Sequence, residues 1–115
     1  MILSDGDRRV IASALMWSAG VHFVQADMAA KLGHKTMAGE KADFAKECKR
    51  LFENFQAPGK LSLYDADGSV IAASLQWAAM EHEKAAKQMA GADRTKRAAF
   101  SGECARLVLL FKKPH

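Results

Sequence analysis

The pattern of apolar and polar positions along the chain occurs twice. The segment that starts at Leu3 matches the one that starts at Leu63, sixty positions later, and the segment that starts at Phe44 matches the one at Phe100, fifty-six positions later. A deletion of four residues in one connecting loop accounts for this change of spacing. The sequence therefore predicts a tandem duplication, with repeat one at residues 3–56 and repeat two at residues 63–112.

Within each repeat the apolar residues recur at spacings of three and four, which is typical of amphipathic helices. Aspartates shortly before Val10 and Val70 are helix N-cap signals, and Gly33 and Gly91 mark the ends of the first and third helices. Each repeat is thus predicted to form a helical hairpin. The expected helices cover about residues 7–31, 39–55, 67–90 and 93–111.

The fold class follows from length and composition. A chain of 115 residues, half of them hydrophobic, has the size of one domain with one core. Ala, Leu, Met, Lys and Glu are abundant, whereas β-branched residues are too sparse to line a sheet. We predict an all-α protein in which residues 1–115 form a single domain, a four-helix bundle with up-down connectivity and pseudo-twofold symmetry.

Positions that both repeats retain are expected to face the shared core, because equivalent helices then present the same apolar stripe. Trp17 and Trp77 flank these stripes. The retained pairs are Ile11/Ile71, Leu15/Leu75, His22/His82, Ala26/Ala86, Phe44/Phe100, Cys48/Cys104, Leu51/Leu107 and Phe55/Phe111.

Charge and the character of the N-terminus narrow the expected partners. The net charge of +4 is moderately basic and spread over both repeats, so weak nucleic-acid binding is one alternative function. No apolar run is long enough to cross a bilayer, and the start of the chain does not resemble a signal peptide. We expect a cytoplasmic protein without membrane contact.

Histidine, glutamate and cysteine residues form the main candidate ligand set. If the first hairpin turns near residues 35–36, equal steps from the turn place His22 level with Glu47 and Cys48. The corresponding trio in repeat two is His82, Glu103 and Cys104. Imidazole, carboxylate and thiolate together suit a transition metal, and the two histidines alone suit a b-type haem.

Other features favour a structural role for the same residues. The chain has neither the Glu-x-x-His pairs of di-iron bundles nor a CxxCH haem signature. Cys48 and Cys104 lie in Phe- and Leu-rich stripes, where desolvation would weaken a thiolate nucleophile. Hydrogen-bonded histidines and buried thiols are the expected state, so we predict a non-enzymatic protein with no cofactor.

The differences between the repeats indicate where another molecule binds. Met16 and Phe23 of the first helix become Gln76 and Glu83 in the third, so the first helix is apolar on almost every side. A helix covered on two sides within the bundle would explain this pattern without a partner. Since contiguous exposed apolar patches usually mark interaction surfaces, we instead predict a protein interface here.

The fourth helix carries a second apolar excess. Leu109 and Leu110 occupy the positions of Glu53 and Asn54 in the second helix, outside the predicted core stripe. Together with the two residues of the first helix, they form the predicted partner interface. The sequence thus predicts a small binding or regulatory module that acts through protein–protein contacts and self-associates as a homodimer.

Overall fold

The computed structural model describes residues 3–112. The regular secondary structure of these residues is entirely α-helical, without any strand. This confirms the predicted all-α fold. The four helices are α1 (Asp5–Lys31), α2 (Lys35–Gln56), α3 (Asp67–Ala86) and α4 (Gly91–Phe111).

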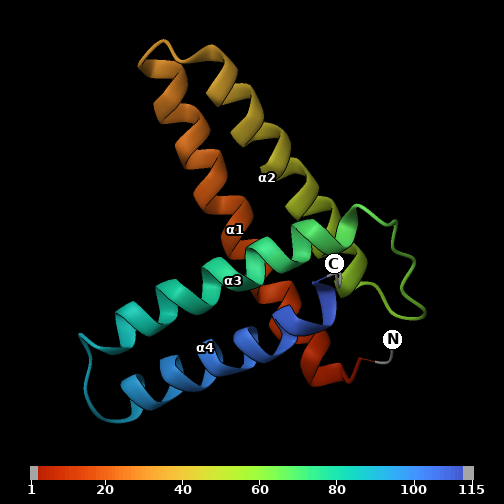
Figure 1. The fold of residues 1–115 in the computed structure, drawn as a ribbon, viewed down its shortest axis with the longest axis vertical. Coiled ribbons are helices and arrows are strands. Elements are labelled where there is room, and N and C mark those ends of the chain that lie inside the picture. Colours follow the sequence, from red (N-terminus) through yellow and green to blue (C-terminus); the bar gives the residue numbers. More distant parts are fainter. Residues whose placement is uncertain (1–2, 113–115) are drawn as a thin grey trace.

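Two helical hairpins make up the bundle. In each hairpin the two helices run antiparallel and pack along their length, α1 with α2 and α3 with α4 (Figure 1). The hairpins cross each other near the start of α1, and their loop ends point apart (Figure 1). Residues 57–66 connect the hairpins outside the helices.

The helix α1 begins with a capping box. The Ser4 hydroxyl accepts a hydrogen bond from the Asp7 backbone N–H at 3.0 Å, and the Asp7 carboxylate accepts one from the Ser4 N–H at 3.3 Å. The N-cap is therefore Ser4, before the aspartates that the sequence pattern favoured. In repeat two Asp67 repeats half of the motif, because its Oδ2 accepts from the Tyr64 N–H at 2.8 Å.

The loop of the first hairpin is shorter than predicted. Only residues 32–34 separate α1 from α2, and Gly33 makes this tight turn possible with φ at 83°, a conformation that residues with a side chain rarely adopt. As a result α2 begins at Lys35, four residues before the predicted start at residue 39. In the other hairpin α3 ends at Ala86, four residues before the predicted end at residue 90.

The core lies where the hairpins cross. Its largest fully buried apolar side chains come from all four helices, and all of them were expected in the core from their retention in both repeats. They are Ile11, Leu15, Leu51, Ile71, Leu75 and Leu107. Toward the loop end of the first hairpin, buried Ala26, Ala29 and Ala45 allow α1 and α2 to approach closely.

Ion pairs connect each hairpin to the start of the other. Arg50 of α2 contacts the Asp67 carboxylate of α3 at 2.6 Å, and Arg106 of α4 contacts the Asp7 carboxylate of α1 at the same distance. Both arginines also pair with a glutamate three residues earlier on their own helix. We call these contacts the crossed ion pairs, and they give the two halves equivalent connections.

Candidate interaction surface

His22 is buried between the two hairpins. Its Nδ1 donates a hydrogen bond to the Ser18 carbonyl at 2.7 Å, one turn earlier on α1. The ring packs at centroid distances of 4.6 Å from Phe44 and 4.9 Å from Trp77. Because the ring is hydrogen-bonded and packed between aromatic side chains, it acts as a structural element of the core.

His82 has a different environment despite its equivalent position. It is half-buried, and its Nδ1 accepts a hydrogen bond from Arg97 at 3.1 Å. Burial, followed by the positive charge of Arg97, lowers the pKa of His82 below its ordinary value of 6.5. Its ring packs against Phe100 at 4.6 Å, as His22 does against Phe44.

The two cysteines are buried, unpaired thiols. Cys48 Sγ lies 3.5 Å from the hydroxyls of Ser18 and Ser74, and so bridges α1, α2 and α3. Burial, reinforced by the negative charge of Glu103, raises the pKa of Cys104 to about 12. At neutral pH that thiol is therefore protonated and a poor nucleophile.

The glutamates lie away from the histidines. Glu47 pairs with Arg50 and Glu103 with Arg106, at 2.6 Å in each case, on the exposed side of their helices. The predicted alignment is off by about one helical turn, because the short loop places His22 beside Phe44 and places Cys48 beside Ser18.

The six residues of the predicted ligand set consequently do not gather. Within residues 3–112 no group of three or more His, Cys, Asp or Glu side chains is arranged to hold a metal ion. Instead, His22 Nδ1 donates to a backbone carbonyl, and one carboxylate oxygen of Glu47 and one of Glu103 accept from arginines. The metal or haem site stays a prediction that this geometry does not support.

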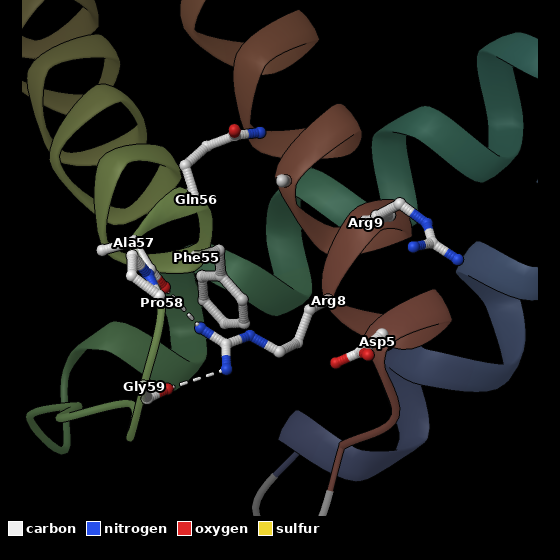
Figure 2. Close-up of a pocket in the computed structure, with 9 residues that line it drawn as sticks. Asp5, Arg8, Arg9, Phe55, Gln56, Ala57, Pro58 and Gly59 are labelled. Atoms are coloured by element: carbon white, nitrogen blue, oxygen red, sulfur yellow. Dashed lines mark hydrogen bonds between the residues drawn. The ribbon is translucent and has the colours of Figure 1, made fainter.

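A cavity of about 400 Å³ lies at the base of the first hairpin (Figure 2). Arg8 crosses it beside Phe55 and donates hydrogen bonds to the carbonyl oxygens of Ala57 at 3.0 Å and Gly59 at 2.9 Å. Arg9 points away from this contact (Figure 2). These two hydrogen bonds of Arg8 hold the segment after α2 against α1.

The most distinctive surface is an exposed stripe along α1, and at its start Asp5 and Arg9 also line the cavity at the base of the first hairpin. Its residues are spaced by three or four, so that they form one stripe, and every one of them is exposed. We call this stripe the outer face of α1. It consists of Asp5, Arg9, Ser13, Met16, Gly20, Phe23, Asp27 and Lys31.

The centre of the outer face is apolar. Met16 is 62% exposed and Phe23 41% exposed, and Val24 and Met28 extend the apolar surface on one flank. Beside the stripe lies a groove of about 570 Å³, lined by Met16, Trp17, Gly20, Val21, Val24 and Gln25. Two of the predicted interface residues, Met16 and Phe23, are therefore both exposed on this face, and Met16 also lines the groove.

Leu109 and Leu110 belong to a different place. They are 72% and 43% exposed at the end of α4, close to Arg106 and so to the first turn of α1. Neither residue lines the groove beside Met16. The comparison of repeats indicated both exposed sites. It did not indicate Gly20, which lies at the centre of the outer face and lines the groove.

Comparisons with models of known protein families, with curated proteins and with solved structures found no match. Within the described residues no helix combines the length and apolar character needed to cross a membrane. The fold and surface thus define the class of protein, a duplicated four-helix protein with an exposed apolar helix face.

Proposed function

We propose that this protein is a non-enzymatic interaction module that binds protein partners, including itself, through the outer face of α1. One observation carries the proposal. Met16 and Phe23 are exposed on α1, whereas the equivalent positions of α3 are the polar Gln76 and Glu83. Because the duplicated helix performs the same core packing without these apolar residues, the fold does not require them.

The chemistry of the interior supports a role without catalysis. The Cys104 thiol has a pKa of about 12, and Cys48 is fully buried. His22 donates to a backbone carbonyl, and His82 accepts from Arg97. These groups maintain the packing of the hairpins, while binding depends on the surface.

A matched pair of variants tests the proposal. Met16 on α1 and Met80 on α3 are 62% and 60% exposed, so Met16→Glu and Met80→Glu introduce the same charge at equal exposure. Tagged wild-type and variant proteins are incubated with extract of the native host and with a differently tagged copy of the chain. Each retained protein is then purified and titrated against all three forms.

The expected result is a partner, either a host protein or the second copy, whose dissociation constant rises at least about tenfold with Met16→Glu and stays unchanged with Met80→Glu. Thermal melting checks that both variants remain folded. If the two variants bound every partner equally well, the outer face of α1 would not be the binding surface.

A further inference from the structure

The outer face of α1 is complementary to itself when reversed. Met16 and Gly20 each lie two residues from position 18, so in an antiparallel pair of α1 helices centred there, each Met16 lies opposite Gly20 of the other copy. A Cβ added at Gly20 would meet no atom within 4 Å, so the space above this glycine is open. The largest flexible side chain at the centre thus faces the one position without a side chain.

The same register pairs the next residues outward. Ser13 and Phe23 each lie five residues from position 18, and therefore face each other across the pair. Again a small residue is opposed to a large one. A helical serine can direct its hydroxyl to a carbonyl of the preceding turn, so an aromatic ring can cover it. This alternation lets two helices interlock with their axes close together, as ridges pack into grooves.

Charges at both ends of the stripe are complementary as well. Arg9 and Asp27 lie nine residues from position 18, and Asp5 and Lys31 lie thirteen residues from it. The antiparallel pairing therefore opposes a positive and a negative side chain at every charged position of the outer face, and Asp27 and Lys31, which already pair with each other at 2.9 Å along α1, would each gain a second partner of opposite charge. A twofold axis repeats each contact, because residue i meets j and j meets i.

The corresponding stripe of α3 lacks this arrangement. Gln76 and Met80 replace the central pair, and Ala73 opposes Glu83. Farther out Lys87 has Ser69 as its counterpart instead of an acidic residue. Core packing shared by the repeats therefore does not explain the reversed complementarity of α1.

We propose that the outer face of α1 binds a second copy of this chain, with the two α1 helices antiparallel and a twofold axis at the level of residue 18. The proposal rests on the proposed function and names its partner. Each Met16 side chain occupies the hollow above Gly20 of the other copy, where the groove beside the stripe begins.

Cysteine cross-linking tests the register. A chain carrying Ser13→Cys is mixed with a differently tagged chain carrying Phe23→Cys, under mild oxidation. The mixed disulfide is expected to exceed either self-disulfide by at least about fivefold, because two copies of residue 13 would be separated by roughly 15 Å along the axis. The buried Cys48 and Cys104 give little background, which the wild-type chain measures.

Charge reversal tests the same register without oxidation. Arg9→Glu and Asp27→Arg should each raise the dimer dissociation constant about tenfold, because each dimer contains two such contacts and attraction is replaced by repulsion. The double variant should return to within about threefold of the wild type. Within one chain the two positions are roughly 27 Å apart, so rescue requires contact between copies. Lys87→Glu, directly after the end of α3, is the control.

The outcomes separate the two proposals. A dimer that shows neither the mixed disulfide nor the rescue would overturn the antiparallel register while leaving the interaction module intact. A monomer at all concentrations, with a host partner that Met16→Glu disrupts, would overturn the second copy as occupant but not the function. A monomer without any such partner would overturn both.

Discussion

Two histidines at equivalent positions have come to occupy different electrostatic environments. His22 is enclosed by aromatic rings and a backbone carbonyl, whereas His82 is half-buried beside the guanidinium of Arg97. The pKa of His82 is lowered by burial first and by the charge of Arg97 second. A single cation on α4 thus affects how the second hairpin responds to pH.

Replacing Arg97 with Gln should raise the pKa of His82 toward 6.5, because the repulsion between two positive charges is removed. The proton resonances of the imidazole, followed as a function of pH, measure this change. Arg94→Gln on the same helix removes an equal charge from an exposed position and serves as the control. Equal pKa values in the two variants would contradict the assigned cause.

The same shift determines how stability depends on pH. The native pKa of His82 lies below the unfolded value of about 6.5, so the unfolded chain binds the proton more readily. The stability contributed by neutral His82 is present above pH 6.5, and it is lost as the pH falls through that value toward the native pKa. Denaturant midpoints should follow this trend, and Arg97→Gln should reduce it.

At the scale of helices, the sequence predicted which helices pair and which faces meet, but not the register. A slip of about one turn brings the same apolar stripe back to the same side, so periodicity cannot distinguish registers that differ by one turn. The length of the loop determines which register forms, and that length depends on the positive φ of Gly33. For this reason the hairpin and its core were predictable, whereas the neighbours of His22 were not.

The residues of the crossed ion pairs recur in both repeats, but the sequence does not show which of them meet. Arg50 and Arg106 recur in the two repeats, as do Asp7 and Asp67, but each arginine contacts the aspartate of the opposite hairpin. Such a connection between repeats cannot be derived from one hairpin alone. It requires knowing how the hairpins cross.

Removing the two arginines should have unequal effects. The side chain of Asp67 is 4% exposed and that of Asp7 19% exposed, so Arg50→Met leaves the more deeply buried carboxylate without its ion-pair partner. We expect Arg50→Met to lower the free energy of unfolding by about 1–3 kcal/mol and Arg106→Met to lower it by less. Urea denaturation measures both. Equal losses would show that burial of the aspartate does not govern the contact.

At the scale of the whole molecule, the core belongs to neither hairpin alone. Leu15 from the first hairpin and Leu75 from the second are fully buried in one cluster at the crossing. Toward its loop end, each hairpin lies apart from the other (Figure 1). The prediction of a single domain therefore depends on whether this shared cluster unfolds in one step.

Leu75→Ala should lower the free energy of unfolding by about 2–5 kcal/mol, since a fully buried leucine is truncated. Hydrogen exchange should then accelerate in α1 and α2 as well as in α3 and α4, because the core is common to both hairpins. Met80→Ala on the exposed side of α3 is the control and should change stability by less than about 0.5 kcal/mol. Faster exchange confined to the second hairpin would contradict the single domain.

For the candidate surface, the sequence indicated exposed apolar residues but not their arrangement. The loss of symmetry between the repeats indicated Met16 and Phe23 from the sequence alone. The role of Gly20 was not accessible, because a glycine contributes nothing to an apolar pattern. Only the exposure of all eight positions of the stripe makes its reversed complementarity meaningful.

The reciprocal form of the crossed ion pairs has a consequence for the origin of the protein. Each hairpin offers the other an arginine and accepts one through its own aspartate. Two separate, identical hairpins could make both contacts at once. A single hairpin could therefore have formed the same bundle as a homodimer. A duplication of one hairpin is therefore enough to create both contacts together, with residues 57–66 joining the two copies in one chain.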